Sequence, residues 1–342
     1  MIADNSSTAA LDPQAESNAR DWINRLAPFI VPDNRRSWFE LCVTGALFVL
    51  VWLASFALEA ISPWLLPPVW VLGGALMVRL FICQHDCGHY SLFSSKRVNS
   101  WVGRCLGVIT LTPYEYWRST HAAHHAGSGN LDRRGLGDID TLTVTEYRAL
   151  KPAARLAYRI YRNPLVLFVF GPAFLFLIQH RWPTAVIKLG KPAVISVLGT
   201  NVAVAVLFYL LISVFGLKAF LLVHIPMIVV GSSIGVWMFY IQHQFEQTNW
   251  EESDDWSQPY SALHGSSYYD LPKPVMWMTG NIGIHHVHHL SSRIAFHKLP
   301  KVLESYPELK RIGRMTFKES LACIPLTLWD SNQKKLVTFA AA

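Results

Sequence analysis

The feature of this 342-residue chain with the clearest chemical meaning is the spacing of its histidines. On a helix, residues three or four positions apart share one face, so His85 can point the same way as His89. The same spacing recurs in two further boxes, 121–125 and 285–289, and His243 follows a long apolar stretch. Nine of the 14 histidines are therefore candidate metal ligands: His85, His89, His121, His124, His125, His243, His285, His288 and His289.

Imidazole nitrogen binds Fe, Cu, Zn and Ni, so the candidate ligands do not by themselves identify the metal. One ion cannot use eight or nine ligands, whereas two ions can share them with four or five each. The chain has no His-Glu-x-x-His motif, which disfavours a zinc protease. It has no Glu-x-x-His motif either, which disfavours the carboxylate-bridged di-iron bundle of soluble oxidases. No dinucleotide loop or P-loop occurs, so electrons must come from outside the chain.

The remaining histidines and the acidic residue in the first box are given other roles. Asp86 is a candidate for a helix cap or for a hydrogen bond that orients a ligating imidazole. His286 faces away from its neighbours on a helix and is a candidate to support the ligating residues rather than to bind metal itself. Four isolated histidines are interpreted as core or interfacial residues: His180, His224, His264 and His297.

The chain that must position these residues is apolar, with 51% hydrophobic and 15% charged residues. About a quarter of residues are charged in an ordinary soluble domain, so this composition disfavours a disordered chain or a soluble α/β enzyme. Five cysteines without a Cys-x-x-Cys motif predict neither a disulfide framework nor a zinc finger. The first 36 residues are polar, which predicts no cleavable signal peptide.

Four stretches are long and apolar enough to cross about 30 Å of hydrocarbon. They are Phe39–Ala60, Trp64–Cys83, Ala193–Phe215 and Lys218–Ile241. Two shorter apolar stretches, Trp101–Pro113 and Leu165–Gln179, are predicted to be re-entrant or interfacial. Arg79, late in the second span, is expected to extend its side chain to the membrane interface.

Arginines before the first span predict that the N-terminus lies in the cytoplasm. They are Arg20, Arg25, Arg35 and Arg36. The spans then form two hairpins, and every histidine box falls on the cytoplasmic face. We expect an all-α integral membrane protein, with four transmembrane helices and a cytosolic helical cap that carries the boxes.

This topology divides the chain into five segments and sets its expected location. The segments are a cytosolic N-terminal segment (1–36), a first transmembrane hairpin (37–83), a cytosolic or interfacial region with the first two boxes (84–192), a second hairpin (193–242) and a cytosolic C-terminal cap (243–342). The expected location is a bacterial inner membrane, with both termini and the metal site in the cytoplasm.

The boxes and three neighbouring segments resemble the membrane fatty acid desaturases over about residues 35–325. The neighbouring segments are Gly137-Asp138 with the residues that follow, Trp237–Glu246 and Gly265–Pro272. The likeness is closer to the acyl-lipid Δ12/ω-6 branch, whose first box is His-x-x-x-His rather than the longer box of acyl-CoA Δ9 enzymes. The resemblance implies a di-iron centre that uses O2 and two electrons for each double bond. Asp138 and Asn281 lie in segments that carry the resemblance and are further candidates to hold a ligating imidazole in place by a hydrogen bond.

The resemblance also implies the substrate and the partner. The substrate is the acyl chain of a membrane lipid. No His-Pro-Gly-Gly haem motif occurs, so an external electron donor, ferredoxin or similar, is expected. A net charge of +7 would attract an acidic donor, although positive-inside bias and lipid contact explain the charge equally well. We expect no nucleic-acid partner, and the oligomeric state is open.

Breaking an unactivated C–H bond requires a strong oxidant, which His-bound iron with O2 can supply and zinc cannot. A kinked tunnel would hold one C–C bond near the metals and exclude water. Candidate tunnel residues, which could equally form an interfacial aromatic belt, are Trp117, Trp237, Tyr240, Tyr268, Tyr269 and Trp277.

Two alternatives remain. The same di-iron centre could serve a hydroxylase or other oxygenase of an acyl chain or a carotenoid. From another class, a membrane metal transporter or haem-binding protein would also need histidines. A transporter places its ligands near the bilayer midplane, and a transmembrane haem needs histidine pairs within the spans. Boxes that all fall on one face disfavour both.

Overall fold

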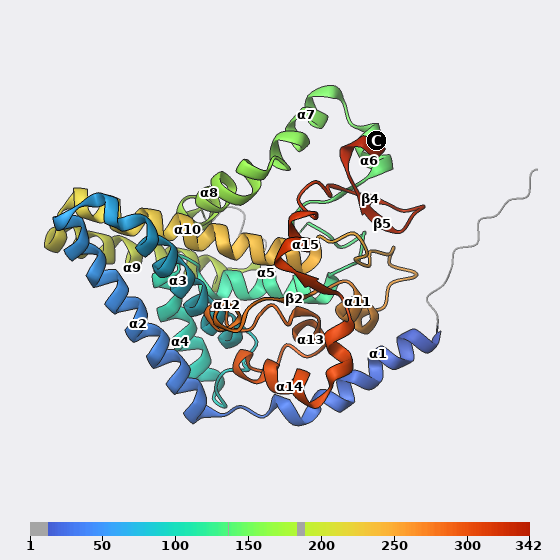
Figure 1. The fold of residues 1–342 in the computed structure, drawn as a ribbon, viewed down its shortest axis with the longest axis horizontal. Helices are drawn as coiled ribbons and strands as arrows, with labels where there is room; N and C mark the ends of the chain where they lie inside the picture. The colour runs from blue at the N-terminus through green and yellow to red at the C-terminus, as the bar shows by residue number, and fades with distance from the viewer. Residues whose placement is uncertain (1–12, 136, 183–188) are drawn as a thin grey trace, which may run out of the picture.

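The computed structural model describes residues 13–135, 137–182 and 189–342. Long helices gather on one side of the molecule, and short helices, loops and strands form the other side (Figure 1). The long helices are α2 (Asn34–Ile61), α3 (Leu66–Gly88), α9 (Lys191–Phe215) and α10 (Leu217–His243). Each is long and apolar enough to cross a membrane, which confirms the four predicted spans.

Helices α3 and α10 form the centre of the helical side. Half of the most apolar window of α3 is buried inside the protein, compared with 11% for α9. The two central helices approach closely at Gly74, where a Cβ atom would lie 2.9 Å from the backbone nitrogen of Gly231. Small residues allow this approach between membrane helices. The main hydrophobic core joins this pair to α4 and includes Leu80, Leu106 and Ile241.

The connection within each hairpin of long helices is short. Asp33 caps α2 by accepting a hydrogen bond from the backbone N–H of Arg36 (3.0 Å). The 3-10 turn η2 (Pro63–Leu65) leads from α2 into α3. Gly216 alone separates α9 from α10 and has a φ of +80°, which glycine adopts without strain.

Two short apolar segments pack against the long helices. Helix α4 (Lys96–Ile109) packs on α3, and α5 (Tyr114–Gly127) follows it and packs on α9. Helix α7 (Pro152–Tyr161) leads to the π-helical turn η3 (Val166–Phe170) and α8 (Gly171–Leu177). The axis bends by 61° between 152–161 and 166–181. Taken as one unit, this bent pair would be a fifth candidate span.

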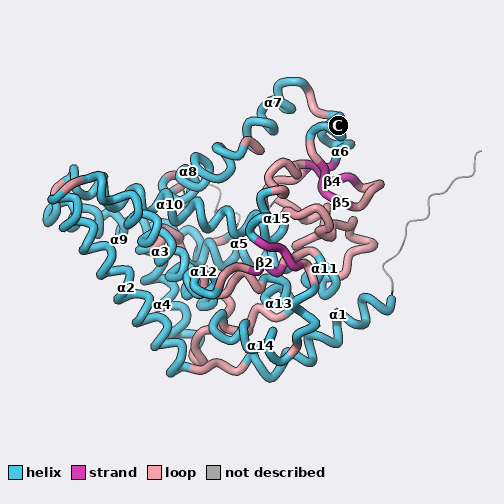
Figure 2. The backbone as a smooth tube through the Cα atoms, in the orientation of Figure 1, coloured by secondary structure: helices cyan, strands magenta, loops and turns pink. Residues whose placement is uncertain are grey.

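The other side of the molecule is built from short elements (Figure 2). Its helices are α1 (Pro13–Leu26), α6 (Val144–Ala149), α11 (Gln258–His264), α12 (Lys273–Met278), α13 (His285–Leu290), α14 (Leu299–Ser305) and α15 (Phe317–Leu321). Further 3-10 turns are η1 (Ala27–Ile30), η4 (Gln179–Arg181), η6 (Phe296–Lys298), η7 (Pro307–Arg311) and η8 (Phe339–Ala341).

The strands form two small sheets. Strand β1 (Leu142–Thr143) is parallel to β4 (Leu328–Asp330), which is antiparallel to β5 (Lys335–Val337). Strand β2 (Tyr268–Asp270) is parallel to β3 (Arg314–Thr316), with Tyr269 opposite Met315. Strands of two or three residues are too short to produce an alternating sequence pattern, so the prediction of an all-α protein did not include them.

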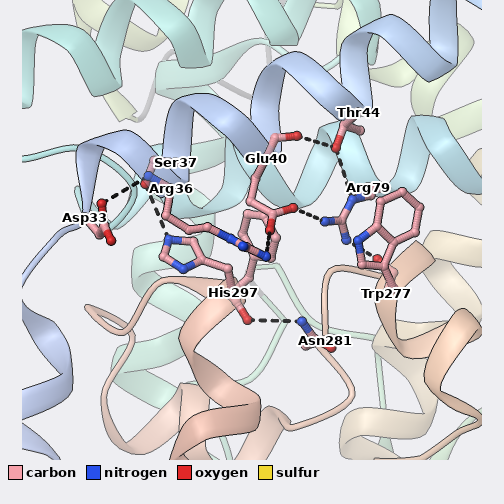
Figure 3. A network of polar contacts seen from close by, with 10 residues as sticks. Asp33, Arg36, Ser37, Glu40, Thr44, Arg79, Trp277, Asn281 and His297 are labelled. Carbon is pink, nitrogen blue, oxygen red and sulfur yellow. Dashed lines mark hydrogen bonds and ion pairs between the residues drawn. The ribbon is translucent and has the colours of Figure 1, made fainter.

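The prediction for Arg79 is wrong, because its side chain does not extend to the interface. Arg79 is 1% exposed and forms a buried ion pair with Glu40 of α2 (Figure 3). The guanidinium also donates to Thr44 Oγ1 (3.0 Å) and to the carbonyl oxygen of Trp277, whose ring lies 4.0 Å away. Three hydrogen-bond acceptors and an aromatic ring offset the cost of removing the Arg79 guanidinium from water. The sequence prediction had assumed that only solvent could stabilise this charge.

Candidate metal centre

Four elements bring the nine candidate ligands to one place. Helix α3 contributes His85, and His89 caps its C-terminal end. Helix α5 carries the second box, α10 ends at His243, and α13 carries the third box. The nitrogens form two groups, and within each group the ligand atoms all lie within 4.8 Å of one another. The first group is His85, His89, His121, His125 and His288, and the second is His124, His243, His285 and His289.

Neighbouring ligand nitrogens are close enough to share a cation. In the first group, Nε2 of His125 lies 3.1 Å from Nε2 of both His121 and His288. In the second group, Nε2 of His243 lies 3.2 Å from that of His124 and 3.0 Å from that of His285. Neutral imidazoles cannot satisfy every such contact by hydrogen bonds, because each ring has a single N–H.

Other nitrogens of the two groups have no hydrogen-bond partner in the described part of the chain. Nε2 of His85, His89 and His289 is buried without a hydrogen bond to any described residue. Burial, together with the neighbouring imidazoles, lowers the pKa of several candidate ligands well below the usual value. They are His89, His121, His125, His285, His288 and His289. The rings are thus held neutral, which is the form that binds metal, and the donor set fits two metal ions.

The second nitrogen of three candidate ligands is oriented by an oxygen atom. Nδ1 of His85 lies 2.9 Å from Oδ1 of Asp86, and Nδ1 of His124 contacts the carboxylate of Asp138. Nδ1 of His243 lies 3.3 Å from the carbonyl oxygen of Gly265. Contacts of this kind fix which nitrogen faces a metal.

The side chains of the two other candidates, Asn281 and His286, form no hydrogen bond with a candidate ligand among the described residues. Asn281 donates to the carbonyl oxygen of Phe296 (3.4 Å), and the N–H of Phe296 donates to Asp86 (2.6 Å). Asn281 therefore reaches the first group only through two intervening residues. His286 lies outside both groups, and its Nε2 contacts the carbonyl oxygen of Leu309 (3.0 Å).

Replacement of Asp138 by asparagine should weaken metal binding by about 10–100-fold, because the neutral amide holds the His124 ring less strongly. The measurement is the concentration of a competing chelator that removes half of the bound metal. The matched control is Asp254→Asn, a change of the same kind at an exposed carboxylate outside both groups. An unchanged chelator concentration for Asp138→Asn would show that the contact does not support the site.

A cavity of about 720 Å³ extends from the two groups between the helices. His85, His121 and His285 line it at the metal end, together with Asp138. From there it follows α10 from Gln242 to Ile228, about 21 Å along the helix axis. Its walls away from the ligands are mostly apolar, so an alkyl chain fits its chemistry.

The six candidate tunnel residues do not form one wall of the cavity, and three of them contact one another instead: Trp237 donates to the Tyr269 hydroxyl (3.4 Å) and stacks on the Tyr240 ring. Trp117 lines the cavity, and its ring stacks on His121 with centroids 4.5 Å apart. The other five are absent from the cavity lining among the described residues. The Tyr240 hydroxyl donates to the carbonyl oxygen of Cys323. The hydroxyls of Tyr269 and Ser320 share a hydrogen bond. Aromatic side chains near the ligands therefore serve packing as well as the cavity wall.

The four isolated histidines have different environments. Nδ1 of His224 accepts a hydrogen bond from Trp52 (3.3 Å), His264 packs on the Tyr260 ring, and His297 lies 3.4 Å from Ser37 Oγ. These positions agree with a core or interfacial role. His180 is buried, as expected, but it lines the cavity. No spacing pattern connects His180 with the boxes, so the sequence contained no signal for this placement.

The chain matches the family model described as Fatty acid desaturase over residues 62–317. A protein of Bacillus subtilis named fatty acid desaturase is 40% identical over 93% of this chain and 90% of its own length. The sn-1 oleoyl-lipid 12-desaturase of Anabaena variabilis is 25% identical over 86% of this chain and 83% of its own length. The sn-1 acyl-lipid omega-3 desaturase (ferredoxin) of a Synechocystis species is 28% identical over 76% of this chain and 74% of its own length. The matched region contains all nine candidate ligands.

Proposed function

Since this chain belongs to the fatty acid desaturase family, we propose that it desaturates the acyl chains of membrane lipids with two iron ions as its cofactor. The enzyme is a membrane-bound oxidoreductase of lipid metabolism. The observation that carries the proposal is the convergence of nine imidazole nitrogens into groups of five and four at the end of an apolar cavity.

The nine histidines are the proposed iron ligands. When bound, iron with O2 and two electrons supplies the oxidising power to remove two hydrogens from an alkyl chain. Asp86 and Asp138 hold the rings of His85 and His124 in position. The cavity wall holds the alkyl chain beside His85, His121 and His285 and excludes water from the reacting bond.

The proposed substrate class is an acyl chain linked to a membrane lipid, with Δ12/ω-6-like selectivity. Support comes from relatives named as oleoyl-lipid 12-desaturases. The apolar cavity is lined in part by helices that are long and apolar enough to cross a membrane, and the proposed entry of the lipid chain is lateral, between these helices. The proposed electron donor is a separate ferredoxin or similar protein, as in the relative whose name specifies ferredoxin.

The proposed orientation places the iron site and both termini in the cytoplasm of a bacterial cell. The arginines at 20, 25, 35 and 36 support it through the positive-inside rule. In this orientation 1–36, 84–192 and 243–342 lie on the cytoplasmic side, the last two as a cap over the hairpins 37–83 and 193–242. An electron donor then reaches the site from the cytoplasm.

Lipid profiling by mass spectrometry in a bacterial host that expresses the chain tests the function. We expect lipids that are two hydrogens lighter than those of cells carrying the empty vector. Lipids heavier by one oxygen atom would instead identify a hydroxylase. An unchanged lipid profile with a donor supplied, or a haem absorbance in the purified protein, would contradict the proposal.

A further inference from the structure

Five glycines of the described chain line the cavity: Gly135, Gly137, Gly171, Gly231 and Gly235. For four of them, backbone conformation or packing explains why no side chain is present. Gly135 and Gly137 have φ values of +106° and +82°, which glycine adopts without strain. A Cβ atom at Gly171 would lie 2.8 Å from a backbone oxygen one turn earlier, and one at Gly231 would lie 3.1 Å from the carbonyl oxygen of Gly74.

Gly235 has neither explanation. It lies in the interior of α10 and does not have a positive φ. A Cβ atom placed on it would have no neighbour within 4 Å outside its own stretch of α10 among the described residues. Alanine is more stable than glycine in a helix interior, so an alanine would fit here and would favour the helix. The space beside Gly235 belongs to the cavity, which indicates that the occupant of the cavity uses it.

Gly235 lies midway along the part of α10 that lines the cavity. Ile228, Gly235 and Gln242 follow one another at intervals of seven residues, nearly two helical turns, so they lie on one face of α10. Gly235 is therefore about 10.5 Å along the helix axis from each of the other two. Gln242 marks the metal end, since the candidate ligand His243 follows it. A side chain at position 235 would project into the passage between the two halves of the cavity.

The half of the cavity beyond Gly235 suits the methyl end of an alkyl chain. Here α10 contributes Ile228 and Ser232, and the Ser232 hydroxyl already donates to the carbonyl oxygen of Val229 (3.0 Å). No side chain of α10 in this half needs a ligand to complete its hydrogen bonds, so an apolar group is favoured.

We propose that Gly235 determines the length of the acyl chain that the enzyme accepts, because its missing side chain lets the methyl end pass from the metal end into the far half of the cavity. The inference rests on the proposed function. With the reacting bond held beside His85, His121 and His285, the rest of the chain extends past Gly235. A larger residue would close the cavity about halfway along α10, so chains whose methyl end reaches beyond this point would be rejected.

The test compares Gly235→Leu with the wild type on a series of lipids that differ only in the number of methylene groups at the methyl end of the acyl chain. For the longest chains we expect kcat/KM to fall about 10–100-fold, the effect of one overpacked side chain. The shortest accepted chains should react as they do with the wild type. Gly235→Ala adds a single methyl group and should give an intermediate result. Iron content should equal that of the wild type in both variants.

Gly199→Leu and Gly199→Ala are the matched controls. Gly199 lies in the interior of α9, is exposed and likewise has no neighbour within 4 Å outside its own stretch of helix, but it is not among the described residues that line the cavity. These variants should keep the wild-type dependence on chain length. An unchanged dependence in folded, iron-loaded Gly235→Leu would overturn the inference, and so would an equal loss for every chain length. If Gly235→Leu does not fold, Gly235→Ala decides between the same outcomes, because its methyl group makes no close contact.

Binding to the metal-free protein separates this inference from the proposed function. The affinities for the same lipids, measured by competition with a radiolabelled lipid, should fall for the long chains in Gly235→Leu. Equal affinities of Gly235→Leu and the wild type for these chains would overturn the inference and leave the desaturase function intact. A wild-type enzyme that desaturates none of the lipids would instead overturn the proposed function.

Discussion

Replacement of His124 by alanine is expected to abolish desaturation and to lower the iron content, while the protein still inserts into the membrane. His124 is 2% exposed and belongs to the smaller group of candidate ligands, so its loss leaves three nitrogens for that ion. The substitution also leaves the carboxylate of Asp138 without its imidazole partner. The iron-to-protein ratio of the purified variant and the lipid profile of expressing cells measure the two effects.

His264→Ala is the matched control for this variant. His264 is a partly buried histidine that packs on Tyr260 and lies outside both groups, so its removal should leave iron content and product formation near wild-type values. Full iron content and normal turnover in His124→Ala would refute the assignment of the second group. The same loss of iron in both variants would indicate general unfolding instead.

Replacement of Arg79 by methionine is expected to destabilise the protein by about 3–5 kcal/mol. The substitution leaves Glu40, which is 2% exposed, as a buried carboxylate without its closest cation. Arg36 also contacts Glu40, but its side chain is about half exposed and approaches from the solvent side. The measurement is the free energy of unfolding in detergent.

The double variant Glu40→Leu/Arg79→Met separates charge burial from loss of packing. Removing both charges should restore most of the stability, because apolar pairs often replace buried ion pairs at little cost. Lys335→Ala, at the Lys335–Glu246 pair, whose side chains are 37% and 61% exposed, is the control and should have little effect. Equal stability of Arg79→Met and the wild type would contradict a stabilising role for the buried pair.

The Arg79 network also connects the first hairpin to the metal centre. Arg79 holds the carbonyl oxygen and ring of Trp277 at the end of α12, and its guanidinium lies 5.2 Å from the Phe296 ring. The N–H of Phe296 donates to Asp86, which contacts His85. Loss of Arg79 is therefore expected to lower iron content as well as stability.

Local patterns in the sequence were sufficient to locate the candidate membrane helices and to select the candidate ligands. Hydropathy depends on consecutive residues, so it located α2, α3, α9 and α10 without knowledge of their neighbours. Helical periodicity placed His85 and His89 on one face in the same way. The number of imidazoles further predicted two groups with four or five members each, and the structure gathers five and four.

Only the tertiary structure decided how these residues are combined. His124 and His125 are adjacent in the sequence but belong to different groups, because their rings leave α5 in different directions. Asp138 reaches His124 from a loop, Glu40 meets Arg79 from another helix, and His180 lines the cavity. Such contacts depend on how segments distant in the sequence pack together. A histidine-rich, apolar sequence thus determines the elements and their chemistry, whereas packing between those elements determines which groups meet.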